Sequence, residues 1–477
     1  MFIGREDELN ALKTMYASNR FEMMVLHGRR RVGKTSLIDR FLTKKKALYF
    51  TARQQNSRLI LQSFCTAISA YLGFSTPLNF ATWDDAIGFL VDNAKKASET
   101  GTGKTIIVLD EFPYAAEAEP GLPSILQIAI DHGFSNTNTM LILSGSNQGF
   151  MEHEVLGSKS PLYGRRTGQL NLQPFDCFDA ARFLPGHSPD DLVKYYATFG
   201  GTPYYLAQLR PELSYEQNVA NLCFSKTGIL YEEPMMLLRE ELKNPAIYDS
   251  ILQAVGNGCN TSKTIAERIG IAPTSLPFYL KTLEELRLVE RVMPFGEKPT
   301  SRKSRIRIKD PFLAYWYRFV APNVTFIETG SGSMVAQRVC NSEAFSTYVG
   351  QQFETICLQW VLRAGRAEQL PLLPAQTGKW WGNNPIKREE TDIDVVAADP
   401  FDKKLLLGEC KWRNRVNETE MVEALRERIG LIRGYKEAIL AFFTKNPVHE
   451  ATRAKYAADP NTIFVSADDM FHSKKGR

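Results

Sequence analysis

The alternation of apolar and polar positions along the first half of the chain follows one repeated plan. Short apolar runs, bounded by turn-forming or charged residues, alternate with longer amphipathic segments. The short runs predict strands and the amphipathic segments predict helices, an order typical of a parallel sheet flanked by helices in an α/β fold. We expect strands at Phe21–His27, Ala47–Thr51, Thr105–Asp110 and Thr139–Ser144, and helices at Thr35–Thr43 and Arg58–Leu72.

The pattern changes after residue 170, so that we expect four parts. Residues 1–170 form the α/β core, and residues 171–245 predict helices without a strong strand. Residues 246–325 predict three short helices followed by a basic, strand-like segment, and residues 335–477 combine one long helix with further strands. The polar segment Glu328–Ser333 (ETGSGS) is the best candidate for a linker.

Composition excludes several classes of protein. A length of 477 residues with 44% hydrophobic and 23% charged residues is typical of a globular protein of about three domains, not of a disordered or fibrous chain. No apolar run of about 18 residues and no secretory signal pattern occurs, so we expect no membrane association. The seven cysteines are scattered singly, which predicts reduced thiols in the cytoplasm. A net charge of +5 is too small to demand nucleic acid.

The strongest motif is a glycine-rich loop between the first strand and the first helix. The segment Gly28–Thr35 (GRRRVGKT) fits the phosphate-loop pattern G-x-x-x-x-G-K-[ST] in the expected strand–loop–helix context. Backbone N–H groups of such a loop surround phosphate oxygens, and the helix N-terminus adds partial positive charge. Lys34 is expected to reach the β- and γ-phosphates, and the Thr35 hydroxyl to bind Mg²⁺. The candidate nucleotide-binding residues are Gly28, Arg29, Arg30, Arg31, Val32, Gly33, Lys34, Thr35 and Ser36.

Two carboxylates follow the third predicted strand. At this position relative to a phosphate loop, Asp110 is expected to hold magnesium through water and Glu111 to orient the attacking water. The next strand ends in hydroxyl and amide groups where a γ-phosphate sensor would lie. The sequence leaves open whether Ser144, Ser146 or Asn147 has this role, or whether the segment is a plain turn.

A second glycine-rich string resembles the phosphate loop but departs from its pattern. In Gly101–Thr105 (GTGKT), the first glycine of the pattern is replaced by Ser98, and a strand follows where a helix is required. We interpret this string as the turn that leads into the third strand.

Six motifs in a fixed order resemble the archaeal-type ATPases, relatives of the AAA+ and STAND ATPases, over residues 1–245. They are Ile3–Leu9, GRRRVGKTSLI, VLDEFPY, LILSGSN, LYGRR and GGTPYYL. The resemblance implies ATP as the nucleotide, Mg²⁺ as cofactor, hydrolysis, and adenine near Ile3–Leu9. It also implies that Gly200–Pro203 belongs to a helical lid, and that Arg165 approaches a γ-phosphate as an arginine finger, in its own chain or across a homo-oligomer. From the residues alone, Arg165 would be an ordinary surface arginine.

The region after the lid predicts a winged helix-turn-helix. Helices are expected at Pro245–Val255, Ser262–Ile269 and Thr274–Val289. The segment Lys298–Lys309 then carries six basic side chains and no acidic one, and the alternation in Arg305–Lys309 predicts a strand with one charged face. Three helices with such a hairpin often bind DNA through phosphate contacts. A packing module with a solvated hairpin is the alternative.

A second pair of carboxylates lies in the C-terminal third. Strands are predicted at Thr391–Val396 and Leu405–Trp412, joined by the turn-forming segment Asp399–Lys404. A hairpin centred in the middle of that segment aligns Asp394 directly opposite Glu409, with their Cβ atoms about 4.5–5.5 Å apart. The sequence therefore predicts an acidic site on this hairpin, although exposed strands also carry carboxylates as plain surface charge.

The residues around this acidic pair favour phosphodiester hydrolysis. Lys411 shares the strand face of Glu409, and Glu354 flanks an apolar helical stripe that would pack on the sheet. Two carboxylates can hold Mg²⁺ or Mn²⁺, which polarises a phosphate and lowers the pKa of a bound water. The ammonium of Lys411 would offset the charge that develops.

The set of Glu354, Asp394 and Glu409-Cys410-Lys411 resembles the PD-(D/E)XK nuclease superfamily over about residues 343–445, and Trp380-Trp381-Gly382 agrees with it. The resemblance implies that Asp394 and Glu409 are metal ligands, Lys411 the catalytic cation and Glu354 an auxiliary residue. Many members of the superfamily keep the fold and lose cleavage.

These observations together predict a cytoplasmic, ATP-driven switch that controls a DNA-directed output, namely metal-dependent cleavage. Two alternatives stay open. One is a regulatory ATPase whose nuclease-like fold only binds DNA or protein partners, and the other is a protein-interaction switch without nucleic acid.

Overall fold

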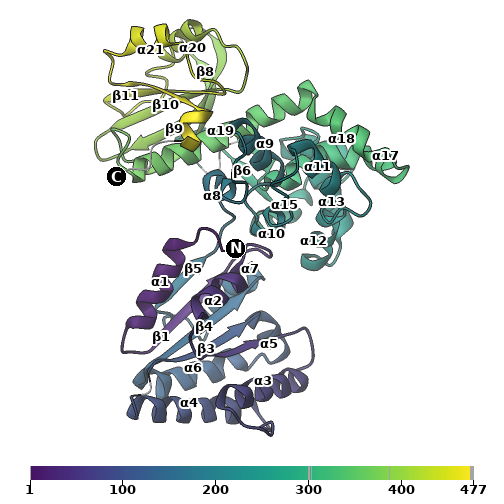
Figure 1. Cartoon of the computed structure of the whole chain (residues 1–477), viewed down its shortest axis with the longest axis vertical. Coiled ribbons are helices and arrows are strands. Elements are labelled where there is room, and N and C mark those ends of the chain that lie inside the picture. The colour runs from purple at the N-terminus through teal and green to yellow at the C-terminus, as the bar shows by residue number, and fades with distance from the viewer. Residues whose placement is uncertain (1, 102, 299–300, 302, 386, 473–477) are drawn as a thin grey trace. The chain divides into compact units, whose positions relative to one another are not determined.

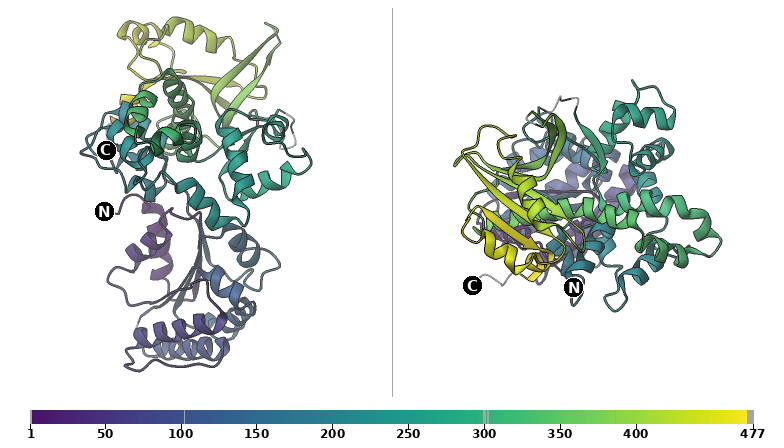
Figure 2. Two further views of the ribbon diagram at one scale, coloured as in Figure 1. Left: turned by 90° about the vertical axis from the view of Figure 1, so that its right-hand side faces the viewer. Right: turned by 90° about the horizontal axis from the view of Figure 1, so that it is seen from above.

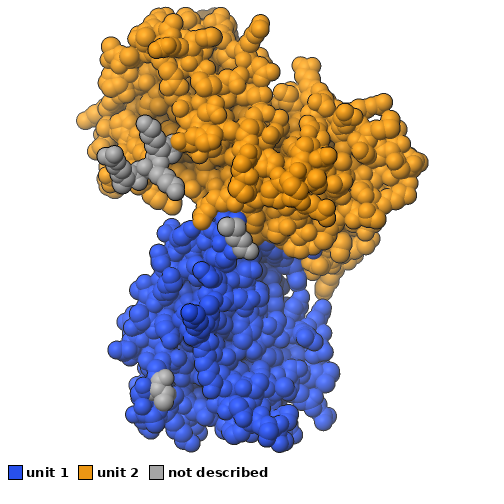
Figure 3. All heavy atoms as spheres, in the orientation of Figure 1, with its two compact units in different colours: residues 1–174 blue, residues 175–477 orange. Residues whose placement is uncertain are grey.

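The computed structural model describes residues 2–101, 103–298, 301, 303–385 and 387–472 (Figure 1). Two further views are given in Figure 2. The chain divides into two compact units, residues 1–174 and residues 175–477, coloured separately in Figure 3. Among the described residues, no helix combines the length and the apolar character that spanning a bilayer requires.

The first unit is built on a five-stranded parallel sheet in the order β2-β3-β4-β1-β5. Its strands are β1 (Glu22–His27), β2 (Leu48–Thr51), β3 (Thr105–Asp110), β4 (Thr139–Gly145) and β5 (Gly168–Asn171). The first four confirm the strands predicted from the apolar runs. The fifth was missed because its sequence, GQLN, is short and mostly polar.

Helices cover both faces of this sheet, because successive strand residues point to opposite sides. Met24, Leu26 and Ile142 belong to one apolar cluster with the first two helices, whereas Val25 and Leu143 belong to a second cluster with α3, α4 and α6 (Figure 1). The helices of this unit are α1 (Glu6–Ala17), α2 (Lys34–Leu42), α3 (Ser57–Leu72), α4 (Trp83–Glu99), α5 (Phe112–Ala118), α6 (Leu122–His132) and the short α7 (Gln148–Phe150).

The second unit begins with helices, as the sequence predicts for residues 171–245. They are α8 (Cys177–Ala181), α9 (Pro189–Phe199), α10 (Pro203–Leu206), α11 (Tyr215–Cys223) and α12 (Glu233–Glu241). The Gly200–Pro203 turn packs against the first residue of the unit: the Phe175 amide donates to the Gly201 carbonyl at 2.8 Å. A Cβ atom at Gly201 would lie 1.7 Å from the Phe175 carbonyl oxygen, so only glycine fits there.

Three helices and an antiparallel hairpin follow. They are α13 (Pro245–Gly256), α14 (Ser262–Ile269), α15 (Leu276–Glu285), β6 (Val289–Val292) and β7 (Arg305–Ile308). The third helix is shorter than predicted. It begins at Leu276 with Pro277 in its first turn, and it ends at Glu285 because Arg287 adopts a left-handed conformation, with φ of 56°.

The C-terminal part contains a mixed five-stranded sheet in the order β12-β11-β10-β9-β8, antiparallel at β8-β9-β10 and parallel at β10-β11-β12. Its strands are β8 (Gln376–Asn384), β9 (Glu389–Asp399), β10 (Lys404–Lys411), β11 (Glu437–Thr444) and β12 (Thr462–Ser466). The long helix α19 (Glu343–Arg366) packs on one face, and α20 (Glu418–Arg426) and α21 (Glu450–Tyr456) on the other, while α22 (Ala467–His472) ends the described chain.

One apolar cluster runs from Phe175 to Met470, so the three C-terminal parts expected from the sequence share a core. The prediction of a linker at Glu328–Ser333 is wrong. This segment forms a tight turn between α17 (Val324–Glu328) and α18 (Gly332–Cys340), and Gly332 is buried against the Phe224 carbonyl. A polar, glycine-rich segment signals a turn as readily as a linker. The remaining α-helix of this region is α16 (Pro311–Tyr315), which continues into a π-helical segment at Trp316–Val320 and a 3-10 turn at Ala321–Asn323.

Candidate nucleotide-binding site and C-terminal acidic site

The phosphate loop leaves β1 at His27 and enters α2 at Lys34. A Cβ atom at Gly28 would lie 2.5 Å from the Leu172 carbonyl oxygen, and Gly33, with φ of 91°, forms the N-cap of α2. Both positions therefore favour glycine. The buried Lys34 donates from Nζ to the carbonyl oxygens of Gly28 (2.9 Å) and Arg29 (3.2 Å), which curves the loop around its ammonium group.

The other loop residues differ in exposure. Arg29 and Val32 are buried, whereas Thr35 and Ser36 at the start of α2 are exposed. Arg30 donates to the Tyr114 hydroxyl at 2.7 Å, and Arg31 has a left-handed conformation with φ of 70°. The loop thus presents the Thr35 hydroxyl and the helix N-terminus to solvent.

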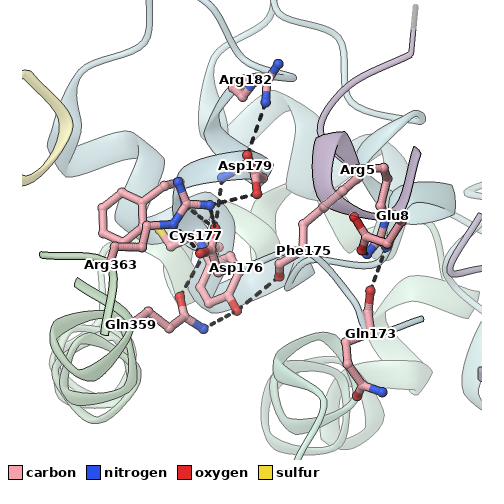
Figure 4. A network of polar contacts seen from close by, with 12 residues as sticks. Arg5, Glu8, Gln173, Phe175, Asp176, Cys177, Asp179, Arg182, Gln359 and Arg363 are labelled. Carbon is pink, nitrogen blue, oxygen red and sulfur yellow. Dashed lines mark hydrogen bonds and ion pairs between the residues drawn. The ribbon is translucent and has the colours of Figure 1, made fainter. Parts of the chain in front are cut away.

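The predicted adenine-proximal box abuts this loop. Arg5, which precedes α1 in a left-handed conformation, donates to the carbonyl oxygens of Val32 (3.1 Å) and Gln173 (2.6 Å). It also pairs with Glu8 at 3.1 Å. The guanidinium of Arg5 therefore links the N-terminal box to the phosphate loop. Its contact with Gln173, in the segment after β5, is drawn in Figure 4.

Asp110 ends β3 beside the loop. Its Oδ2 accepts from the Tyr49 hydroxyl (2.9 Å) and lies 3.4 Å from Thr35 Oγ1, and its Oδ1 accepts from the Glu111 amide (3.1 Å). Burial, followed by the charge and hydrogen bond of Asp110, raises the pKa of Tyr49 far above its usual value. Tyr49 therefore stays a neutral donor to this carboxylate, and the Thr35 hydroxyl and Asp110 converge as a magnesium site requires.

Glu111 has a strained backbone, with φ of 48°, as the N-cap of α5. Its carboxylate accepts from the Ser146 hydroxyl (2.6 Å) and from the Ser146 amide (3.1 Å). Asn147 caps α7 instead, and the buried Ser144 hydroxyl has no hydrogen-bond partner among the described residues. Of the three sensor candidates, Ser146 is thus the one bonded to Glu111.

Arg165 lies near the opposite end of the strands from the phosphate loop. Its guanidinium makes a two-pronged contact with Asp131 (2.6 and 2.8 Å) and also donates to the Pro161 carbonyl. Thr167 bonds Met23 near the start of β1, whereas the loop follows the end of that strand, about 15 Å away at roughly 3.3 Å per residue. The structure does not bring Arg165 to the phosphate loop of its own chain.

The acidic hairpin has the register that the turn chemistry predicts. Leu407 pairs with Val396 and Gly408 with Val395, so Asp394 and Glu409 follow directly after the last paired residues of the two strands. Asp394 Oδ2 accepts from the Cys410 amide at 2.9 Å. The two carboxylates thus project from neighbouring strands at one end of the sheet.

Cations surround this pair. Lys411 bonds one oxygen of Glu409, and Arg428 bonds the other at 2.5 Å. Burial and the charge of Glu409 raise the pKa of Asp394 to about 6. The two carboxylates therefore share one electrostatic environment, and positive charge compensates Glu409 more directly than Asp394.

Glu354 is linked to this site through Lys379 of β8. Glu354 and Lys379 form an ion pair, and the charge of Asp394 acts on the same ammonium group. Burial lowers the pKa of Lys379 despite that opposing effect. The four predicted residues thus come together, with Lys379 and Arg428 as partners that sequence reasoning missed.

The donor set is compatible with a divalent cation. Within the described ranges, no group of three or more His, Cys, Asp or Glu side chains could hold a metal. Mg²⁺, however, is commonly bound through one or two carboxylates, with water and substrate phosphate completing its shell. The raised pKa of Asp394 also indicates like-charge repulsion with Glu409, which a bound cation would relieve.

The basic hairpin is partly neutralised. Arg307 pairs with Glu290 at 2.6 Å, Lys309 approaches the same carboxylate at 3.9 Å, and Lys303 pairs with Glu297 at 2.7 Å. The predicted basic residue Arg302 lies outside the described residues.

Comparisons with known proteins agree with the nucleotide site. A family model described as "ATPase domain predominantly from Archaea" matches residues 2–209, and one described as "Archaea bacterial proteins of unknown function" matches residues 316–423. Among solved structures, the Walker-type ATPase PABY2304 of Pyrococcus abyssi is similar, with a TM-score of 0.51, 19% identity, and coverage of 66% of this chain and 96% of that one. This likeness shows a shared fold.

Two curated relatives come from Methanocaldococcus jannaschii. The uncharacterized ATP-binding protein MJ0423 is 48% identical over 46 residues, which cover 10% of this chain and 78% of that protein. The uncharacterized protein MJECL04 is 30% identical over 414 residues, which cover 87% of this chain and 88% of that protein. The chain therefore belongs to the family of MJECL04, and it carries an archaeal-type P-loop ATPase domain followed by a C-terminal domain of unknown function.

Proposed function

We propose that the chain is an ATP-hydrolysing switch that acts on DNA, and that its C-terminal acidic site cleaves phosphodiester bonds. The observation that carries the proposal is the convergence of Asp394, Glu409 and Lys411 in a chain that also contains an ATPase domain. In this proposal, ATP hydrolysis in the first unit controls phosphodiester cleavage at the acidic site.

In the nucleotide site, Mg²⁺ would be held by the Thr35 hydroxyl and, through water, by Asp110, and would neutralise phosphate charge. Lys34 would exchange its loop carbonyls for the β- and γ-phosphates. Glu111 would orient the attacking water, with its carboxylate fixed by Ser146. Arg165, held by Asp131 away from the loop, would act only on a nucleotide of a neighbouring chain in a homo-oligomer.

In the acidic site, Asp394 and Glu409 would hold Mg²⁺ or Mn²⁺, which supplies Lewis acidity toward the phosphate. Lys411 would move from Glu409 toward the negative charge that develops on phosphorus-bound oxygens. Glu354 would act as a positioning residue, because it fixes Lys379 beside Asp394.

DNA would be bound by the three helices α13 to α15 and the β6–β7 hairpin acting as a winged helix. The exposed cations of β7 suit phosphate contacts, whose affinity falls as salt concentration rises. We place the proposed activity in the cytoplasm, since the cysteines are free thiols.

The test is conversion of supercoiled plasmid by the full chain with ATP and Mg²⁺ or Mn²⁺. We expect nicked or linear product from the unmodified protein, and at least about a 100-fold slower reaction from Asp394→Asn, because one metal ligand is lost. The matched control is Asp392→Asn, an exposed carboxylate two residues away, which should cut normally. Intact plasmid under every nucleotide and metal condition would contradict cleavage.

One observation favours a second candidate function. Both oxygens of Glu409 are already bonded by Lys411 and Arg428, a charge balance that does not need a metal. A regulatory ATPase whose C-terminal domain binds DNA without cutting would have such a site. It would retard DNA in gel shifts to the same extent with and without the Asp394→Asn substitution, and it would never nick the DNA.

A further inference from the structure

The basic hairpin is joined to the edge strand of the C-terminal sheet. The Phe295 amide donates to the Lys379 carbonyl of β8 at 2.6 Å, and Pro294 forms a parallel bridge with Lys379. The guanidinium of Arg305 lies over the ring of Trp381, 4.7 Å from its centroid. These contacts join β6, β7 and β8 into one continuous surface within the second unit.

Arg305 differs from Lys303, Arg307 and Lys309 of this hairpin. Lys303, Arg307 and Lys309 each have a carboxylate within 4 Å, whereas no described carboxylate pairs with Arg305. Arg305 is exposed and Trp381 half-buried, so the stacked pair offers an uncompensated positive charge beside an aromatic ring. This combination suits a ligand with both anionic groups and flat rings.

The stacked pair also lies next to the acidic site along the sheet. Trp381 pairs across β8 and β9 with Asp392, two residues before Asp394. Lys379, two residues before Trp381, joins Glu354 to Asp394. At roughly 3.3 Å per strand residue, Asp394 lies about 7 Å along β9 from the residue that pairs with Trp381.

We propose that Arg305 and Trp381 form a strand-positioning element, which binds an unpaired segment of DNA and directs its backbone toward Asp394 and Glu409. A base would stack on Trp381, and Arg305 would contact the neighbouring phosphate. The unpaired segment is required because bases within a duplex already stack on one another. The inference rests on the proposed function for its cleavage step, and its binding step is measured independently.

Binding is tested with the full chain carrying Asp394→Asn, which prevents cleavage, and a fluorescent single-stranded oligonucleotide. We expect Trp381→Ala and Arg305→Ala each to weaken binding roughly tenfold, since base–aromatic stacking contributes about that much. Trp381→Phe should keep most of the affinity. Lys95→Ala, at an exposed lysine on α4 of the first unit, also removes one positive charge, but outside the proposed winged helix, and should change little. Thermal unfolding midpoints equal to the parent show that each variant is folded.

Cleavage provides the second readout, on a fork with one duplex arm and two unpaired tails. With Asp394 restored, the unmodified chain should cut at a fixed distance from the junction, and Trp381→Ala should scatter the cut positions and raise KM more than it lowers kcat. Unchanged single-strand affinity in both alanine variants, or binding to duplex alone, would overturn the positioning element even if plasmid cleavage is observed. If the unmodified chain cuts no DNA but Trp381→Ala weakens single-strand binding, the proposed cleavage is contradicted. The same result supports the strand-positioning element.

Discussion

The two carboxylate pairs of this chain have similar side chains in contrasting surroundings. Asp110 and Glu111 end a central strand of the first unit, and their described partners are neutral donors, namely the Tyr49 and Ser146 hydroxyls and backbone amides. Asp394 and Glu409 belong to adjacent strands of the second unit, where Lys411 and Arg428 bond Glu409.

The difference shows how each site handles negative charge. Neutral donors orient Asp110 and Glu111 without cancelling their charge, so the pair would keep its attraction for the magnesium ion of the proposed nucleotide complex. Lysine and arginine cancel the charge of Glu409, so a metal would have to compete with them. The carboxylates of the first site are held by neutral donors, whereas Glu409 of the proposed second site would have to exchange charged partners when a substrate binds.

The rate of ATP hydrolysis should change most when the cation of the first site, Lys34, is removed. We expect Lys34→Ala to lower the rate of ATP hydrolysis by about 100- to 1000-fold, because transition-state charge on the phosphates loses a buried partner. Phosphate release measured at saturating Mg²⁺ and ATP gives the rate.

The chain offers a matched control for this change. Lys104 belongs to the similar string GTGKT just before β3, but its ammonium donates to the Ser18 hydroxyl and the Arg20 carbonyl, which lie between α1 and β1. Lys104→Ala should therefore hydrolyse ATP at the parent rate. Equal loss in both variants would refute the assignment of the phosphate loop.

At the second site, the free energy of unfolding should depend on pH through the ionisation of Asp394. The pKa of Asp394 is about 6 in the folded chain against 3.8 for an ordinary Asp. Between these values the folded carboxyl keeps a proton that the unfolded one has lost, so stability falls as pH rises from about 4 to 6. Above pH 6 the full penalty, about 1–2 kcal/mol after allowance for solvent, is present.

Asp394→Asn removes this penalty, so we expect it to raise the unfolding free energy at pH 7.5 by about 1–2 kcal/mol and to change it little at pH 4. Urea denaturation followed by tryptophan fluorescence at the two pH values measures the difference. Glu390→Gln is the control, because this exposed carboxylate lies on the same strand, four residues from Asp394. A gain that is the same at both pH values would contradict repulsion between Asp394 and Glu409.

The role of the neutral donors is tested at Ser146, where we expect a smaller change in the rate of ATP hydrolysis than at Lys34. Ser146→Ala deletes the hydroxyl bond to Glu111 and keeps the amide bond, so the rate of ATP hydrolysis should fall about tenfold with unchanged ATP affinity. Ser144→Ala, which deletes a buried hydroxyl without a described partner, should be nearly neutral. A larger loss of hydrolysis rate in Ser144→Ala than in Ser146→Ala would assign the sensor role to Ser144 instead.

The parts of the sites that depend on local chemistry could be predicted from the sequence. The phosphate loop follows from its glycines, and the turn-forming Asp399–Lys404 segment sets the register that aligns Asp394 with Glu409. The short apolar runs of β1 and β4 likewise predicted a parallel sheet covered on both faces. In each case the residues that decide the structure are close in sequence.

The missed features depend on contacts between distant segments. Lys379 comes from an edge strand with weak alternation, and Arg428 from the segment after α20, so no local pattern connects either to the acidic pair. The shared apolar core of the second unit could not be predicted either, because helical patterns do not say which helices pack together. The sequence pattern therefore separated three C-terminal parts that share one apolar core in the structure.

The backbone is anchored by hydrogen bonds on both sides of Pro174. The Gln173 carbonyl is held by Arg5 in the first unit, and Phe175 to Asp179 are held in the second by Gly201, Gln359 and Arg363 (Figure 4). A single residue of about 3.5 Å reach, with its φ fixed by the proline ring, spans the two anchors. Pro174 is therefore the one residue between backbone that is held within the first unit and backbone that is held within the second.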